Sequence, residues 1–335
     1  MNLALITMGN NMITESPFKP AWWLANAHAQ TLYPVFTRYL TAPIDNMERF
    51  ELPDGDFIDL AWAVNGVSKD APVVVFLHGL GGNVNSKYVA GLLHAVNKCG
   101  WRGVLMHFRG ASAEINRLPR AYHSGDTADL DCWLRALEKR EPHTKKALVG
   151  ISLGGNVLLK WLGEQGAQPL VHAAVAVSVP FKLGLVADRI NQGFSRIYQK
   201  HLLQRMRNVF KQKIENHADD FPASFSKLDS IQCFWTFDEN ITAPLNGFPH
   251  VHAYYREASS AQYLINIATP TLVIHALDDP FMTPAVVPKA EELSKDIRLE
   301  LSSGGGHVGF ITGNVPGVPV YWLDQRVPEF LQEYL

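Results

Sequence analysis

The chain has 335 residues, of which 47% are apolar and 19% are charged. This balance is ordinary for a folded globular protein and excludes a disordered or coiled-coil chain. The 30 basic residues almost balance the 32 acidic ones, so the net charge of −2 gives no overall attraction to nucleic acid. We therefore expect a sizeable core and no nucleic-acid partner.

Cysteine content and the N-terminal residues bear on where the protein works. The three cysteines lie far apart and match no zinc spacing. Because an odd number cannot form a complete set of disulfides, they favour a reducing compartment. The apolar stretch at residues 1–8 lacks the basic region of a signal peptide, and nowhere do eighteen apolar residues follow one another. We expect a cytoplasmic protein without a transmembrane segment, and its oligomeric state is left open.

The chain begins with an arm, up to about residue 45, that is rich in aromatic residues and proline and is expected to pack on the body. After it, residues 49–52 and 57–62 show partial alternation of apolar and polar side chains. They flank Pro53-Asp54-Gly55-Asp56, which is a turn sequence. The pattern predicts an antiparallel hairpin near the N-terminus.

The next segments predict a mostly parallel, doubly wound α/β sheet. Residues 73–77 are apolar at every position, as in strands that are buried on both faces. Similar runs recur, and helical stretches with apolar stripes at spacings of three and four lie between them. Strand and helix in repeated succession place helices on both faces of the sheet. The other strand runs are residues 104–106, 147–149, 173–177 and 271–274, and the helical stretches are 88–96, 127–137 and 156–162.

This succession fails between residues 181 and 267, which we interpret as a cap inserted into a core of residues 1–180 and 268–335. Its best helix carries an apolar line of Tyr198, Leu202, Met206 and Phe210. Basic residues lie off that line. They are either a solvated outer face, which is the commoner case, or a lid surface that meets anionic lipid headgroups in peripheral membrane contact. The basic residues are Lys200, Arg205, Arg207, Lys211 and Lys213.

The pentapeptide Gly150-Ile151-Ser152-Leu153-Gly154 lies between a predicted strand and a predicted helix that begins near Gly155. Such a sharp turn lifts a serine hydroxyl above the sheet, and small residues two before and two after it let the backbone pass. The positive end of the helix then faces the serine, where an oxyanion would develop. We predict that Ser152 is a nucleophile.

A second glycine-rich strand end, His78-Gly79-Leu80-Gly81-Gly82, matches the other half of an oxyanion hole. The backbone N–H groups of Leu80 and Leu153 are the predicted pair of donors. A histidine before such a loop is more often structural, so His78 is given no part in proton transfer.

An acid and a base should follow the nucleophile in chain order, on loops after late strands. Asp278 and Asp279 end the predicted strand at 271–274, and three glycines precede His307 after residues 297–301. Asp279 is the predicted acid, because it lies three residues beyond Ala276, the small residue that closes the strand. His307 would take the Ser152 proton while Asp279 orients and stabilises the imidazole. No metal or cofactor is expected, because the other histidines lack ligand spacing.

These residues resemble the YheT-like α/β-hydrolases of bacteria, whose eukaryotic relatives include α/β-hydrolase-domain lipases and yeast medium-chain ester synthases. The resemblance covers nearly the whole chain, and its leader and loop motifs are more specific than the serine turn. They are Pro20-Ala21-Trp22-Trp23, His28-Ala29-Gln30-Thr31, His78-Gly79-Leu80-Gly81-Gly82, Tyr122-His123-Ser124-Gly125, Ser152-Leu153-Gly154-Gly155-Asn156, Asp278-Asp279-Pro280-Phe281 and Gly306-His307-Val308-Gly309-Phe310.

The resemblance implies the α/β-hydrolase fold and hydrolysis of carboxylic esters or lipids with acyl chains of medium length by a Ser, Asp and His triad. Two alternatives stay open. One is acyl transfer to an alcohol on the same triad. Relatives with transferase activity are cited for a histidine followed five residues later by an aspartate, but the residue five positions after His123 is Ala128. The other is a ligand-binding protein without catalysis on a hydrolase scaffold.

Overall fold

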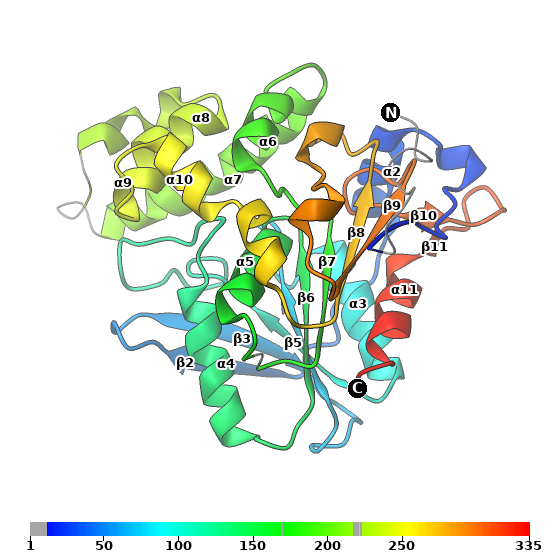
Figure 1. Ribbon diagram of the computed structural model, residues 1–335. Coiled ribbons are helices and arrows are strands. Elements are labelled where there is room, and N and C mark those ends of the chain that lie inside the picture. Colours follow the sequence, from blue (N-terminus) through cyan, green and yellow to red (C-terminus); the bar gives the residue numbers. More distant parts are fainter. Residues whose placement is uncertain (1–11, 169, 217–220, 222) are drawn as a thin grey trace.

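The computed structural model describes residues 12–168, 170–216, 221 and 223–335 (Figure 1). The stretch at residues 1–8, which we expected not to be a signal peptide, lies outside them. Within the described part of the chain, no helix is both long and apolar enough to cross a membrane.

One nine-stranded sheet forms the centre of the molecule, in the order β1-β9-β8-β7-β6-β4-β5-β3-β2. The strands from β1 to β5 in this order pair in parallel, and only β3 and β2 run antiparallel to their neighbours. The predicted parallel sheet with an N-terminal antiparallel hairpin is thus confirmed. The strands are β1 (Ile13–Glu15), β2 (Asn46–Glu51), β3 (Phe57–Ala63), β4 (Val73–Leu77), β5 (Arg102–Met106), β6 (Lys146–Ile151), β7 (Ala173–Val177), β8 (Thr271–Ala276) and β9 (Ile297–Ser302).

Helices cover both faces of this sheet because both faces of its central strands are apolar. In β4, Val73, Val75 and Leu77 pack into one hydrophobic cluster and Val74 and Phe76 into another, as alternating side chains require. Residues of α4 (Ala128–Arg140) and α5 (Leu153–Gln165) belong to the first cluster. Residues of α3 (Lys87–Lys98) and α11 (Leu323–Leu331) belong to the second, on the opposite side in Figure 1.

The described part of the segment between β7 and β8 consists of helices joined by turns and contains no strand. Figure 1 shows its helices gathered beyond one end of the sheet. Their own hydrophobic clusters hold them together, around Phe210 and Phe237 in one place and around Tyr254 and Tyr255 in another. The helices are α6 (Leu183–Ile190), α7 (Ser195–Asn216), α8 (Phe234–Phe237), α9 (Ala243–Leu245) and α10 (Val251–Ala258), and a π-helical turn, Asp238–Thr242, joins α8 to α9.

The N-terminal arm is more closely built into the fold than the sequence suggested. Its strand β1 adds to the sheet edge beside β9, with Ile13 opposite Leu299. Its helix α2 (Ala27–Thr37) is capped by Asn26, whose side chain accepts the N–H groups of His28 and Ala29. A small hairpin of β10 (Ile311–Thr312) and β11 (Val320–Tyr321) lies near it, since Ala21 N–H donates to the Ile311 carbonyl.

Two expectations need correction. The helix after Ser152 begins at Leu153 rather than near Gly155, so the serine itself is the N-cap residue. Lys213 was expected on an outer basic face of α7, but its side chain is fully buried. Its Nζ donates to the carbonyl oxygens of Leu118 and Arg120, at 2.9 and 3.0 Å, because a loop far away in sequence supplies these acceptors.

Candidate active site

Ser152 occupies a strained turn between β6 and α5. Its φ of +54° lies in the left-handed region that non-glycine residues rarely adopt, and such strain clusters at functional sites. The glycines that flank Ser152 leave no room for a side chain. A Cβ on Gly150 would lie 2.5 Å from the Gly154 carbonyl oxygen. A Cβ on Gly154 would lie 2.4 Å from the carbonyl oxygen of Leu77 in β4. The turn therefore fits closely against the neighbouring strand end.

Three side chains from different strand ends form one hydrogen-bonded chain. The Oγ of Ser152 lies 3.0 Å from Nε2 of His307, and Nδ1 of His307 lies 2.7 Å from Oδ2 of Asp279. Since a carboxylate only accepts, Nδ1 carries the proton, and Nε2 of the neutral ring is then free to accept from Ser152. Phe281 stacks on the imidazole, with ring centroids 4.0 Å apart and planes 10° apart. The ring is thus fixed in both orientation and tautomer.

The two neighbouring carboxylates point to different partners. Asp279 is 3% exposed, and its second oxygen accepts the N–H of Phe281 at 2.8 Å. Asp278 instead accepts the N–H of Gly306 at 2.9 Å, and burial raises the pKa of its carboxyl. Asp279 alone of the pair contacts the His307 imidazole.

The loop that carries His307 is held by the N-terminal arm. The His307 N–H donates to the Thr31 hydroxyl at 2.9 Å. Gln30, which is fully buried, accepts the N–H of Ile311 at 2.7 Å and donates to its carbonyl at 2.9 Å. Ser178 accepts the Val308 N–H at 3.1 Å. In the sequence, Gln30 and Thr31 stand out only as parts of a motif, and no local pattern there indicates that they hold the His307 loop.

Leu80 and Leu153, whose amides are the predicted oxyanion-hole donors, both lie at the cavity onto which Ser152 opens. Leu153 is the first residue of α5, so its N–H has no partner within the helix and the positive end of the helix dipole faces the serine. A Cβ on Gly79 would lie 3.3 Å from the Ser152 Cβ, which brings the loop that carries Leu80 against the nucleophile. Leu80, Leu153, Ser152 and His307 all line one cavity.

His78 is a structural residue of this loop. Its Nε2 accepts the Phe108 N–H at 3.2 Å, so its Nδ1 carries the proton and donates to the Gly79 carbonyl at 2.8 Å. Full burial lowers its pKa to about 3, which keeps the ring neutral. The ring therefore holds the loop and transfers no proton.

Residues 72–314 match the family described as alpha/beta hydrolase fold. The chain belongs to the α/β-hydrolase fold family. It is also 42% identical over 330 residues to the protein named "Putative esterase YheT" of Escherichia coli (strain K12), an alignment that covers 98% of this chain and 97% of that protein. The resemblance to YheT-like hydrolases is thereby confirmed.

Two further comparisons concern a lipase and a solved structure. Monoacylglycerol lipase of Saccharomyces cerevisiae is 32% identical over 253 residues, which cover 72% of this chain and 56% of that protein. The structure of the Pyrococcus furiosus esterase Pf2001 superposes with a TM-score of 0.56 at 17% identity, over 87% of this chain and 91% of that one. The second likeness bears on the fold alone.

The cavity of this hydrolase has a volume of about 810 Å³, within the range of ligand-binding pockets. Its apolar walls come mainly from α2 and from the helices between β7 and β8. They include Leu32, Val35, Leu183, Val186, Ile190, Phe194 and Ile197. Ser152 therefore opens onto a site that suits an apolar chain.

Proposed function

We propose that this hydrolase cleaves carboxylic esters of the esterase and lipase type through an acyl-enzyme on Ser152. The observation that carries the proposal is the hydrogen-bonded chain from Ser152 through His307 to Asp279, opening onto an apolar cavity. The names of the relatives, an esterase and a monoacylglycerol lipase, support the same reaction class.

The proposed mechanism assigns one role to each group. His307 Nε2 takes the Ser152 proton as Oγ attacks the acyl carbon, and Asp279 stabilises the resulting imidazolium. The Leu80 and Leu153 amides donate to the tetrahedral oxyanion. His307 returns the proton to the leaving alcohol, and a water molecule, activated by the same ring, releases the acid and restores Ser152.

The proposed substrate is an ester with an acyl chain of medium length. The apolar cavity walls support an aliphatic acyl group, because burying each CH₂ contributes about 0.8 kcal/mol. A panel of p-nitrophenyl esters from acetate to palmitate tests this proposal. We expect kcat/KM to pass through a maximum between the two ends, and a maximum at acetate would contradict the chain-binding cavity.

Covalent labelling separates catalysis from simple ligand binding. A fluorophosphonate probe reacts with an activated serine, so we expect it to modify Ser152 and to stop ester turnover in proportion. A protein that binds its ligand without catalysis would remain unlabelled. Acyl transfer is tested by adding an alcohol, since a transferase would divert the acyl group from water into a new ester.

The proposal includes a cap formed by residues 181–267 on a core of residues 1–180 and 268–335. It also includes a cytoplasmic location, which three free thiols support. Peripheral membrane contact through the cap is supported by two exposed apolar side chains at the cavity, Phe194 and Ile197, which are 49% and 58% exposed. Arg205 and Arg207 are less suited to lipid, because both donate to backbone carbonyls of the protein itself.

Replacing both Phe194 and Ile197 with serine is expected to weaken binding to anionic phosphatidylglycerol vesicles by about tenfold, because the membrane then buries two fewer apolar side chains. Co-sedimentation measures the bound fraction. Val315→Ser is the matched control, since Val315 is 59% exposed and does not line the cavity. Equal binding by the double variant and the control would exclude membrane contact through these residues.

A further inference from the structure

In the oxyanion loop, residues 79–82, the backbone amides on both sides of Leu80 are hydrogen-bonded to tyrosine hydroxyls. The Gly79 N–H donates to the Tyr88 hydroxyl at 2.9 Å, and the Gly81 N–H donates to the Tyr122 hydroxyl at 2.9 Å. Between them, the Leu80 N–H has no acceptor among the described residues. The two phenols thus satisfy the flanking amides and leave the central one for a ligand oxygen.

Both phenols are held rigidly by their surroundings. Tyr88 lies in the first turn of α3. Tyr122 stacks on Phe108, with ring centroids 5.1 Å and planes 17° apart. Burial raises the pKa of Tyr122 to about 12 and also raises that of Tyr88, so both hydroxyls stay neutral. Each phenol oxygen is therefore a fixed, uncharged acceptor.

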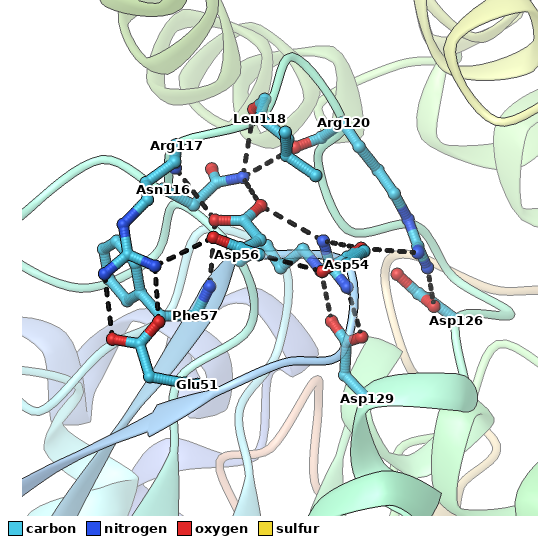
Figure 2. Close-up of polar contacts among 12 residues, drawn as sticks. Glu51, Asp54, Asp56, Phe57, Asn116, Arg117, Leu118, Arg120, Asp126 and Asp129 are labelled. Atoms are coloured by element: carbon cyan, nitrogen blue, oxygen red, sulfur yellow. Dashed lines mark hydrogen bonds and ion pairs between the residues drawn. The ribbon is translucent and has the colours of Figure 1, made fainter.

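The segment before Tyr122 is fixed by the polar network drawn in Figure 2. Arg109 donates to both oxygens of Asp129, at 2.6 and 2.7 Å, and Asp56 accepts the Arg117 N–H at 2.8 Å. Arg120 pairs with Asp126 at 2.6 Å on the other side of Tyr122. The network thus holds the chain before and after Tyr122, while Phe108 holds its ring.

A third contact reaches the oxyanion loop from the cap. Nη1 of Arg205, on α7, donates to the Gly81 carbonyl at 3.0 Å. Gly81 has a φ of +65°, and a Cβ there would lie 3.3 Å from Cδ of Arg205. The peptide groups around Gly81 are thus bound by the core on one side and by the cap on the other.

We propose that Tyr88, Tyr122 and Arg205 are positioning residues that hold the Leu80 N–H in place for the oxyanion, and that Arg205 couples the position of the cap to this hole. The proposal rests on the esterase mechanism above. Preorganised donors stabilise a transition state because they need not reorient as charge develops. Removing a phenol oxygen frees one flanking amide and lets the loop move. Tyr122 does not line the cavity, and phenylalanine at position 88 keeps the aromatic ring that Tyr88 contributes to its wall.

The test compares Tyr88→Phe and Tyr122→Phe with wild type. We expect each variant to lose between about tenfold and a hundredfold in kcat, while KM stays within about twofold. A trifluoromethyl ketone with the same acyl chain forms an oxyanion on Ser152, so its affinity should fall in parallel with kcat/KM. Affinity for the uncharged product alcohol should not change.

Tyr254→Phe is the matched control. Its hydroxyl also accepts a backbone N–H, that of Ser124, at 3.0 Å, but it does not touch the oxyanion loop. We expect this control to lose thermal stability similarly while its kcat stays within about twofold of wild type. If the three variants lose stability alike and none loses kcat, the two phenols are merely structural and the proposal is overturned.

Arg205 is tested by Arg205→Lys and Arg205→Leu. Lysine keeps a donor, so we expect it to retain more kcat and more ketone affinity than leucine, whereas equal values would remove Arg205 from the proposal. Labelling of the wild-type protein by a fluorophosphonate separates failure of the esterase mechanism from failure of the positioning role. Without labelling, the esterase mechanism itself fails; with labelling but unaltered Tyr88 and Tyr122 variants, the positioning role alone fails.

Discussion

Ser152→Ala is expected to reduce ester turnover by about 10⁶-fold, because it removes the only atom that can form the acyl-enzyme in the proposed mechanism. The oxyanion-hole amides and the cavity remain, so a small residual rate above that in water should persist. Fluorophosphonate labelling should disappear completely. Initial rates with a p-nitrophenyl ester, together with mass spectrometry of the labelled protein, measure both effects.

The variant should stay folded. Ser152 makes no side-chain cap contact with α5, and alanine tolerates the same backbone turn about as well as serine. Ser260→Ala is a matched control, because Ser260 is fully buried and its hydroxyl has no partner among the described residues. It should keep normal turnover and labelling. Wild-type turnover in Ser152→Ala would remove Ser152 from the mechanism.

The central sheet was predictable because its strands are buried on both faces, so their apolar runs appear directly in the sequence. The short edge strand β1 was not predictable. It has three residues, one of them exposed, and it pairs with β9 from the other end of the chain. Local patterns carry no signal for such a distant pairing, which depends on how the whole sheet is completed.

Charge on a helix was the least informative pattern. Lys213 lies three residues after Phe210 and seven after Met206, so the helical period places it on the apolar face of α7. Three acceptors from residues 116–120 surround its ammonium group there. A buried lysine is stable only where such acceptors exist, and their positions depend on the folded loop. The same reason concealed Tyr88 and Tyr122, since a phenol that accepts a distant backbone N–H leaves no mark in the sequence.

The chemistry-bearing residues were easier to predict than these supporting contacts. Glycines stand close to Ser152 and His307 in the sequence. They are needed because the backbone of other segments approaches these glycines too closely to leave room for a Cβ. A Cβ on Gly306, for example, would lie 2.4 Å from the Ala27 carbonyl oxygen. Gly306 also has a φ of +61°. The glycine pattern before His307 thus reflects its packing against the N-terminal arm.

Asp279→Asn is expected to lower kcat by about 10⁴-fold, because an amide cannot support the required state of the imidazole. An amide NH₂ facing Nδ1 of His307 would favour the ring tautomer with its proton on Nε2, which cannot accept from Ser152. The neutral amide would also leave the imidazolium without a balancing charge. KM should change little, since Asp279 is not among the residues that line the cavity.

Asp278→Asn provides the matched comparison one residue away. The Asp278 carboxyl accepts the Gly306 N–H, and an asparagine oxygen can accept the same hydrogen bond. Burial already raises the pKa of this carboxyl, so replacing its charge with a neutral amide costs little stability. We expect kcat within about threefold of wild type, since surviving hydrogen bonds limit the cost. A larger loss of kcat at Asp278 than at Asp279 would move the acid by one residue, because only the carboxylate that charge-stabilises His307 can produce the greater effect.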